Sequence, residues 1–371
     1  MVYFDNSSTT KQCKASIDAM VNCIKNDFAN ASSLHTVGVN AKAHIDSLKK
    51  NIASAISCTP NEIYIASGGT YCNNLAIAGV ADAYKRRGNK IVISSIEHPS
   101  VTECAKTLAE KGFEVVMCNP LTNDFENAID EKTILVSCML VNNETGLILP
   151  ADKLKQIIKQ KGSQAILHID AVQAFGKLPI NVQKLGADLL TISAHKINGP
   201  KGIGALYIKK GVRANAITYG GEQEGSLIPG TYNTPAISGF DAAICEILKQ
   251  DKNYLDSLYE YFVKKSEQFD FLKLNTFGNH AAHIINLSFM GYLGENVLHF
   301  LESKNIFVSQ GSACSSHSKQ KAKTLISLGC NKKVADGSIR VSFDFNNTTD
   351  EIDEFFDAVS CVPQQLIKLY K

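Results

Sequence analysis

The sequence predicts an α/β protein with a large domain built on a mostly parallel seven-stranded sheet and a smaller α+β domain. A length of 371 residues is typical of two domains. The middle of the chain alternates β-rich runs with segments of helical periodicity, and this alternation stops after about Phe240. Hydrophobic residues at 44% and charged residues at 20% are ordinary for a globular protein and argue against disorder.

Short β-rich runs supply the candidate strands of the large domain. They are Ile63–Ala66, Ile91–Ser94, Glu114–Cys118, Thr133–Leu140, Ala165–Asp170, Leu189–Ser193 and Gly204–Ile208. Between most of them lie segments with helical periodicity, at Asn74–Arg87, Pro99–Lys111 and Ala151–Lys161. This order predicts parallel strands with helices on both faces of the sheet. The loop Ala194–Gly202 is too short for a crossover helix, so the last two strands are expected to be antiparallel.

The segment after Phe240 predicts the smaller domain. Its expected elements are a long helix Phe240–Phe269, a strand Ala282–Phe289, a helix Gly294–Lys304, a Ser/Gly-rich loop Ser309–Ser318, a strand Ser338–Phe343 and a final helix Asp350–Tyr370. The first residues of the chain are expected to pack beside them. We therefore assign residues 12–250 to the large domain, and residues 1–11 and 251–371 to the small one.

Charge and cysteine content exclude several classes of protein. A net charge of +2 provides no basic surface for nucleic acid or for a membrane. The apolar stretch Leu75–Ala81 is too short to span a bilayer, and the chain does not begin with a signal-peptide pattern. The 11 cysteines include no C-x-x-C pair, so no metal site is predicted. We expect a cytoplasmic protein with reduced thiols.

Three segments of the large domain carry candidate chemistry. Ser67-Gly68-Gly69-Thr70 follows a strand and opens a helix, a place where backbone N–H groups bind phosphate in some proteins and nothing in others. Asp170 ends a strand at the ligand-binding edge of the sheet, where it either caps the next helix or holds a heteroaromatic nitrogen protonated. Lys196 ends a later strand, after Ser193 and His195. A lysine, an acidic residue and a phosphate-binding turn are together the parts of a pyridoxal 5'-phosphate (PLP) site.

Further motifs extend this pattern from one end of the chain to the other. They are Tyr3–Thr10, Ser67–Thr70, Asn73–Ile77, Glu97-His98, Val141–Gly146, Asp170–Gln173, Ser193–Lys196, Gly230-Thr231, Gly311–Ser316 and Ser338–Arg340. In order and spacing the chain resembles the class V aminotransferase-type enzymes of PLP fold type I. Specifically, it resembles the cysteine desulfurases of the NifS/IscS group.

The resemblance implies a PLP cofactor attached as a Schiff base to Lys196, which also shuttles the Cα proton. It implies that His98 stacks on the pyridine ring and assists proton transfer. Asp170 would pair with the ring nitrogen and Gln173 would contact the ring hydroxyl. Asn143 would lie against both cofactor and substrate.

The resemblance also implies a phosphate site and a substrate site. The phosphate-binding residues would be Gly69, Thr70, Ser193, Ala194 and His195, with Thr231 supplied by the neighbouring subunit of a homodimer. Arg340 would clamp the substrate carboxylate with two hydrogen bonds.

Cys314 distinguishes activities within this family. It lies in the small and polar loop Ser309–Ser318, which resembles the group whose cysteine sits on a long movable segment. The expected activity is conversion of L-cysteine to L-alanine, with the sulfur left as a persulfide on Cys314. A sulfur-acceptor protein of iron–sulfur cluster assembly or of a thiolation pathway would then take the sulfur.

Three alternatives stay open from sequence. A selenocysteine lyase or an aminotransferase could use the same fold, although an aminotransferase has no use for Cys314. A catalytically silent regulatory subunit would not need Lys196, Asp170, His98 and Arg340.

Two departures from the family affect the expected partners. Ile228 stands where relatives commonly carry Arg, and the stretch after Arg340 looks short. The sulfur acceptor and the preference for sulfur over selenium are therefore not predicted.

Overall fold

The computed structural model describes residues 1–311 and 323–369. The chain forms two compact units: unit 1 comprises Met1–Thr10, Val141–Ile148 and Gln250–Lys371, and unit 2 comprises Lys11–Leu140 and Leu149–Lys249. Our predicted large domain of residues 12–250 included Val141–Ile148, which the structure groups with unit 1. The physical reason is backbone pairing, because Leu147 bridges His280 and the Ile148 N–H donates to Asn279 O at 2.8 Å.

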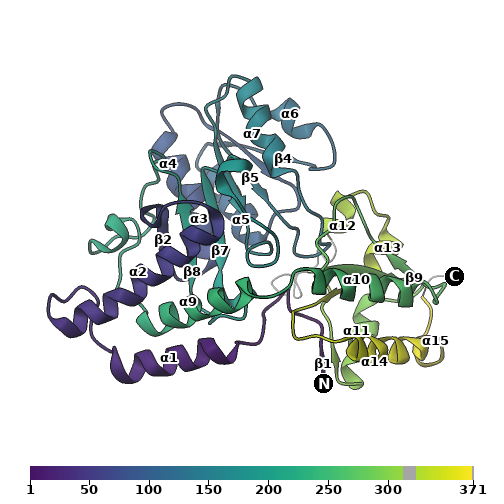
Figure 1. The fold of residues 1–371 in the computed structure, drawn as a ribbon. Coiled ribbons are helices and arrows are strands. Elements are labelled where there is room, and N and C mark those ends of the chain that lie inside the picture. Colours follow the sequence, from purple (N-terminus) through teal and green to yellow (C-terminus); the bar gives the residue numbers. More distant parts are fainter. Residues whose placement is uncertain (312–322, 370–371) are drawn as a thin grey trace. The chain divides into compact units, whose positions relative to one another are not determined.

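Unit 2 is built on a seven-stranded sheet in the spatial order β2-β8-β7-β6-β5-β3-β4 (Figure 1). The strands are β2 (Ile63–Ala66), β3 (Lys90–Ser94), β4 (Glu114–Cys118), β5 (Thr133–Met139), β6 (Ile166–Asp170), β7 (Leu189–Ser193) and β8 (Gly204–Ile208). β8 runs antiparallel to β2 and β7, and the other neighbours are parallel. This confirms the mostly parallel sheet and the antiparallel pairing of its last two strands. Every residue of β5, β6 and β7 is buried, as expected for strands covered on both faces.

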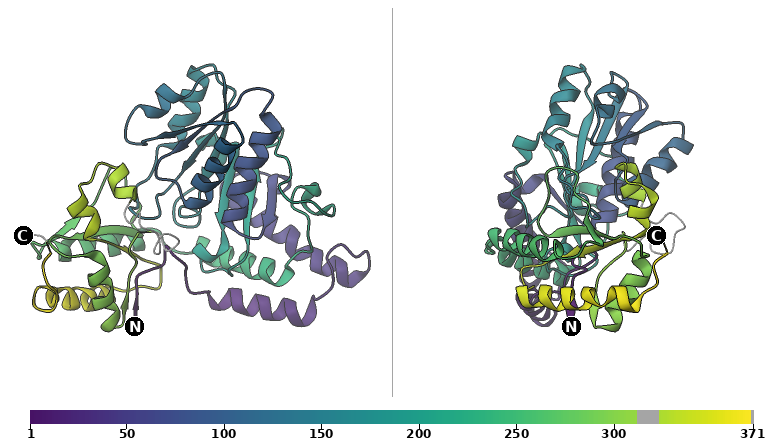
Figure 2. Two further views of the ribbon diagram at one scale, coloured as in Figure 1. Left: turned by 180° about the vertical axis from the view of Figure 1, so that it is seen from behind. Right: turned by 90° about the vertical axis from the view of Figure 1, so that its right-hand side faces the viewer.

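Helices cover both faces of this sheet (Figures 1 and 2). They are α1 (Lys14–Asn26), α2 (Thr36–Ile56), α3 (Gly69–Asn74), the π-helical turn η2 (Leu75–Gly79), α4 (Val80–Tyr84), α5 (Pro99–Glu110), α6 (Asp124–Ala128), α7 (Ala151–Gln160), α8 (Val182–Leu185) and α9 (Thr234–Leu248). Short 3₁₀ turns occur at η1 (Pro60–Glu62), η3 (Ala194–Lys196) and η4 (Gln223–Ser226). Our sequence-based elements did not include α1 or α2.

Unit 1 contains two small sheets. β9 (Leu272–Leu274), β10 (Ile284–Phe289) and β12 (Ser338–Ser342) form an antiparallel sheet, and β1 (Val2–Tyr3) pairs in parallel with β11 (Ile306–Phe307). The helices are α10 (Asn253–Ser266), α11 (Gly294–Ser303), α12 (Lys323–Ser327), α13 (Lys332–Asp336), α14 (Thr349–Ser360) and α15 (Val362–Gln365). Aromatic rings pack against one another in the core, where Phe4 contacts Phe343 and Phe262 contacts Phe355. The N-terminal residues are therefore part of the unit 1 core.

Two of the predicted helices were wrong in extent. The stretch Phe240–Phe269 is not one helix, because α9 ends at Leu248 and α10 begins at Asn253. Between them the Asp251 carboxylate accepts a hydrogen bond from Asn253 N at 3.0 Å, a local turn that competes with helix continuation. The expected helix Asp350–Tyr370 likewise divides into α14 and α15, since Pro363 has no N–H with which to continue α14.

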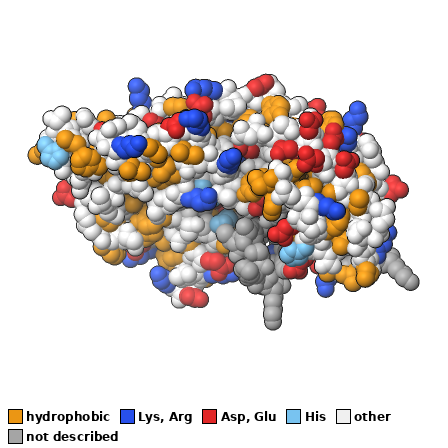
Figure 3. Space-filling view, turned by 90° about the horizontal axis from the view of Figure 1, so that it is seen from below, with side chains coloured by type: hydrophobic (Ala, Val, Ile, Leu, Met, Phe, Trp, Pro, Cys, Tyr) orange, Lys and Arg blue, Asp and Glu red, His pale blue; other side chains and the backbone are white. Residues whose placement is uncertain are grey.

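The surface of unit 2 exposes an apolar stripe on α1. Ile17, Val21 and Ile24 are 46%, 43% and 56% exposed, and their spacing places them on one helix face. Figure 3, seen from below, shows hydrophobic side chains gathered over this region. Separately, no helix in the described part of the chain is both long enough and apolar enough to cross a membrane.

Candidate active site

The turn that opens α3 allows a close approach between two elements. Gly68 has φ +144°, a backbone conformation that favours glycine. A Cβ on Gly69 would lie 3.2 Å from Val172 Cγ2 and 3.4 Å from Ser193 Cβ. The start of α3, which carries Thr70, therefore lies against the carboxyl end of β7. The structure thus brings the predicted phosphate-binding residues Gly69 and Ser193 together.

Asp170 ends β6 at the same edge of the sheet and is buried. Its Oδ1 accepts a hydrogen bond from Val172 N at 2.9 Å, and its Oδ2 accepts one from Asn73 Nδ2 at 2.8 Å. Both oxygens of the carboxylate are therefore held in a fixed orientation. Gln173, also predicted, follows on the buried side of the same turn.

His98 is the N-cap of α5. Its Nδ1 accepts a hydrogen bond from Ser100 N at 3.1 Å and lies 2.8 Å from Ser100 Oγ. Burial lowers the pKa of His98, the Asp170 carboxylate raises it, and the positive charge of Lys196 lowers it, with a net pKa below the usual value. The imidazole is therefore neutral at neutral pH. The influence of Asp170 and Lys196 on one imidazole places these three predicted residues close together.

Lys196 lies in η3, directly after β7, and is partly buried. Its neighbour His195 has a pKa lowered to about 4, first by burial and then by the charges of Lys196, Lys201 and Lys177. The buried Ala194 completes this turn. The turn therefore carries the partly buried Lys196 amine next to the His195 imidazole, which is neutral at neutral pH.

These residues of unit 2 fit PLP. Lys196 offers an amine, Asp170 offers an oriented carboxylate, and the glycine turn beside Ser193 leaves space that a Cβ would fill. Thr231, predicted to serve a neighbouring subunit, lies in an exposed segment between η4 and α9.

The two predicted substrate-binding residues belong to unit 1. Arg340 lies on β12, is 1% exposed, and donates from Nη1 to Asn143 O at 2.8 Å. Its Nη2 donates to Asp5 Oδ1 at 2.7 Å and to Ser8 Oγ at 2.6 Å. Its Nε has no hydrogen-bond partner among the described residues. The guanidinium is thus held in a fixed orientation by Asp5, Ser8 and Asn143 O. A second carboxylate that binds Arg340 would compete with Asp5 for Nη2.

Sequence reasoning assigned no role to Asp5 and Ser8, or to Glu97. Glu97 is buried, its Oε1 accepts a hydrogen bond from Met139 N at 2.6 Å, and its Oε2 has no hydrogen-bond partner in the described ranges. Burial, reinforced by the Asp170 carboxylate, raises the pKa of Glu97 well above its usual value, so the neutral form is favoured. All three residues lie in motifs on which the family resemblance rests, and this was the sequence signal that could have marked them as site residues. Cys314, in contrast, lies outside the described residues.

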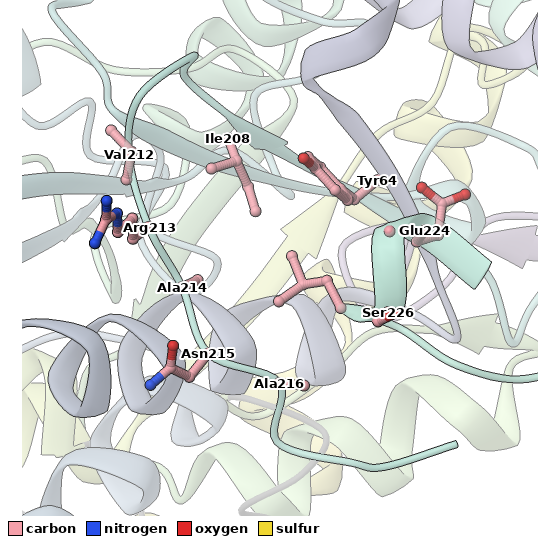
Figure 4. A pocket seen from close by; sticks show the side chains of 11 residues that line it. Tyr64, Ile208, Val212, Arg213, Ala214, Asn215, Ala216, Glu224 and Ser226 are labelled. Carbon is pink, nitrogen blue, oxygen red and sulfur yellow. The ribbon is translucent and has the colours of Figure 1, made fainter. Parts of the chain in front are cut away.

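A pocket of about 440 Å³ lies elsewhere in unit 2, next to η4 (Figure 4). Its lining includes Tyr64, Arg213 and Glu224, and none of the predicted site residues. The buried Glu224 pairs with Lys49 Nζ at 2.6 Å. This arrangement explains how a buried carboxylate is tolerated there, and it assigns no chemistry to the pocket.

Comparisons with known proteins show the family and the fold of this chain. The model of the family described as "Aminotransferase class-V" matches residues 2–355. "Cysteine desulfurase IscS" from Methanosarcina thermophila is 38% identical, over 98% of this chain and 92% of that protein. A solved structure named "NIFS-LIKE PROTEIN" has a TM-score of 0.92 at 30% identity and covers 98% of this chain and 100% of its own. Another, "SspA in complex with cysteine", has a TM-score of 0.82 at 29% identity and covers 92% of this chain and 99% of its own. The predicted fold type is confirmed, and the chain belongs to the class V aminotransferase family.

Proposed function

We propose that this protein is a PLP-dependent cysteine desulfurase that converts L-cysteine to L-alanine and carries the sulfur as a persulfide on Cys314. The observation that carries the proposal is the convergence of Lys196, Asp170 and His98 at one sheet edge, in a chain similar along its length to cysteine desulfurases. An aminotransferase or a selenocysteine lyase would use the same three residues. Cys314 is what favours desulfuration.

The residues of unit 2 hold the cofactor in this proposal. Lys196 Nζ would make the covalent link, the turn at Gly69 and Thr70 with Ser193 would bind the phosphate, and Asp170 would pair with the ring nitrogen. When bound, PLP supplies an electron sink for the electron pair left at the substrate Cα. The Lys196 amine would take up the Cα proton, since it lies beside His98 and Asp170 at this edge of the sheet.

The residues of unit 1 and Cys314 handle the substrate in this proposal. Arg340 binds the carboxylate of L-cysteine, and the carbonyl of Asn143 fixes the orientation of the guanidinium. The Cys314 thiolate attacks the substrate sulfur, so that an S–S bond forms and the substrate C–S bond breaks. One proton leaves the substrate thiol and one proton is delivered to Cβ, so the products are alanine and a persulfide anion. The substrate carbon is reduced while the sulfur is oxidised, so no external oxidant is needed.

The proposed assembly is a homodimer that passes sulfur to an acceptor protein. Exposed Thr231 supports a role toward a neighbouring subunit, and the apolar stripe Ile17, Val21 and Ile24 supports contact of unit 2 with another protein surface. Among the described residues, ten cysteines are free thiols, which supports the expected reducing cytoplasm. The acceptor is not identified by these features.

The decisive experiment replaces Cys314 with alanine. The Cys314→Ala protein is expected to bind PLP and L-cysteine normally, since none of the cofactor or carboxylate contacts described above involves position 314. It is expected to release neither sulfide nor stoichiometric alanine, because no nucleophile accepts the sulfur. Mass spectrometry of the wild-type protein after brief exposure to L-cysteine should show added, reducible sulfur on the peptide that contains Cys314.

Cys330→Ala provides the matched control. Cys330 is a partly buried thiol whose pKa is raised, first by burial, so it is a poor nucleophile and its loss should leave turnover unchanged. Wild-type turnover by Cys314→Ala, or added sulfur on Cys330 instead of Cys314, would overturn the proposal. Steady formation of a keto acid from L-cysteine would indicate an aminotransferase instead.

A further inference from the structure

A buried asparagine connects the two polar residues that flank the proposed ring site. Asn73, only 2% exposed, donates one hydrogen bond from Nδ2 to Asp170 Oδ2 and a second from the same nitrogen to Ser100 Oγ, both at 2.8 Å. An amide nitrogen has two protons, so both are used. Asn73 Oδ1 is buried and has no hydrogen-bond partner among residues 1–311 and 323–369.

That orphaned oxygen shows which orientation of the amide the site requires. Rotating the amide by 180° would place Oδ1 against the Asp170 carboxylate, where two acceptors repel each other. The observed orientation leaves a neutral oxygen unsatisfied in exchange for a hydrogen bond to a charged group, which is the stronger kind. Asn73 therefore acts as a fixed double donor between Asp170 and Ser100.

Ser100 extends this connection to His98. Because Ser100 Oγ accepts from Asn73, its own proton is free to point at His98 Nδ1, 2.8 Å away. The Ser100 backbone N–H points at the same nitrogen, 3.1 Å away. Two donors on Nδ1 leave no place there for a proton, so the single proton of the neutral ring lies on Nε2.

We infer that Asn73 and Ser100 are positioning residues that act as one unit: they orient the Asp170 carboxylate and restrict His98 to the neutral tautomer protonated at Nε2. His98 then carries its hydrogen-bond donor at Nε2, and Nδ1 can take up a proton only by giving up its role as the N-cap of α5. This inference rests on the proposed function for its catalytic meaning. The tautomer itself follows from the geometry of unit 2 alone.

The charged and titratable groups around His98 do not reverse this preference. Asp170 on β6 favours protonation of the ring, whereas burial and Lys196 on η3 oppose it. His195, also on η3, has its pKa lowered to about 4, so it is neutral at neutral pH and adds no charge. The hydrogen-bond donors on Nδ1 are therefore the local feature that selects the tautomer.

The test is imidazole ¹⁵N NMR of the full-length protein with ¹⁵N-labelled histidine, recorded with and without PLP. His98→Gln assigns the His98 signals among those of the 9 histidines. We expect the wild-type ring to show an unprotonated acceptor nitrogen at Nδ1 and a proton at Nε2 near neutral pH. A wild-type ring protonated at Nδ1 overturns the inference, whether or not the protein releases sulfur.

Two variants test the contributions separately. Ser100→Ala keeps the backbone N–H but removes the hydroxyl donor, so the His98 titration midpoint should rise by about half a pH unit or more and the Nδ1–H tautomer should become detectable. Asn73→Ala frees the Ser100 hydroxyl to accept from Nδ1–H, so it should also mix the tautomers. Ser100→Thr, unlike Ser100→Ala, keeps a hydroxyl at this position, so its ring should have the Nε2–H form of the wild type.

The neighbouring Asn74 supplies the matched control. Within the described part of the chain its Nδ2 bonds only backbone oxygens, of Thr70 and Ser100, both at 3.0 Å, so Asn74→Ala should leave the His98 tautomer unchanged. In kinetics, Asn73→Ala should lower kcat with little change in KM, because the carboxylate-binding residue is Arg340. Folded Asn73→Ala and Ser100→Ala proteins with wild-type tautomer and midpoint would contradict the positioning role.

Discussion

Arg340 Nη2 donates a hydrogen bond to Asp5 Oδ1 at 2.7 Å, between residues 335 positions apart in the chain. The arginine is 1% exposed and the Asp5 side chain is 20% exposed. The fifth residue of the chain thus neutralises the one buried arginine of β12. A family motif near the N-terminus and another near the C-terminus are therefore halves of one ion pair.

Replacing Arg340 should lower the stability of the protein. In Arg340→Gln, Asp5 and Asn143 O lose a charged partner inside unit 1, so the free energy of unfolding should fall by about 1–3 kcal/mol. Urea denaturation followed by far-UV circular dichroism measures this loss. The double variant Arg340→Gln/Asp5→Asn should lose less than the sum of its single variants, and additive losses would mean that the pair is not coupled.

Lys196→Ala should lose the covalent attachment of PLP. Wild-type protein treated with borohydride should carry a reduced adduct on the peptide that contains Lys196, since a Schiff base requires that amine. The variant should keep its circular dichroism spectrum and show no adduct. His195→Gln, one residue away, serves as the control and should still form the adduct, although with weaker phosphate binding.

Asp170→Asn should slow proton removal from the substrate. A neutral amide does not keep a ring nitrogen protonated, so the electron sink weakens, and we expect a loss of about a hundredfold or more. Exchange of the Cα hydrogen of L-alanine for deuterium, followed by NMR, isolates this step from sulfur transfer. Near-normal exchange would show that Asp170 has another role.

Thr231→Ala should weaken PLP binding at the neighbouring subunit's site. Mixing Thr231→Ala with Lys196→Ala tests this directly, because a mixed dimer contains one site with both an intact Lys196 and a partner's intact Thr231. After subunit exchange, activity should rise above that of either variant alone. Sedimentation should show a dimer at the assay concentration, and a fully active monomer would disprove the role of Thr231.

Acid should destabilise the protein through His168. This buried imidazole lies between Ser137 Oγ at 2.8 Å and Thr191 Oγ1 at 3.1 Å, and burial lowers its pKa to about 4. Because the unfolded chain binds the proton at about pH 6.5, stability should be full above that pH and should fall as the pH drops toward 4.

His168→Gln is the variant for that measurement. Glutamine keeps hydrogen-bonding groups but does not titrate, so urea midpoints should depend less on pH between 6.5 and 4 than in the wild type. An unchanged slope over this range would assign the acid sensitivity to other groups.

Much of the fold and of the site was predictable because it depends on local pattern. The central strands β5, β6 and β7 of unit 2 were predictable because both of their faces are covered, which makes them continuous β-rich runs with clear ends. The positions of Lys196, Asp170 and the Gly68-Gly69 turn at strand ends and at a helix start were also predictable, because strand and helix boundaries have local sequence signals. These features need only a few consecutive residues.

Other features exist only in the tertiary structure. The break between α9 and α10 depends on a turn at Asp251 and on the change from unit 2 to unit 1, which helical periodicity does not report. The assignment of Val141–Ile148 to unit 1 depends on pairing with Asn279 and His280.

The sequence by itself determined which chemical groups are present: an amine at Lys196, a carboxylate at Asp170, an imidazole at His98 and a guanidinium at Arg340. Only the tertiary structure decided the state of each group. The His98 tautomer depends on its N-cap neighbour Ser100 and on Asn73, which lies 27 positions before Ser100, and the charge of Arg340 is balanced by the distant Asp5. The physical reason is that protonation and orientation depend on burial and on hydrogen-bond partners, which residues distant in sequence supply only when the chain has folded.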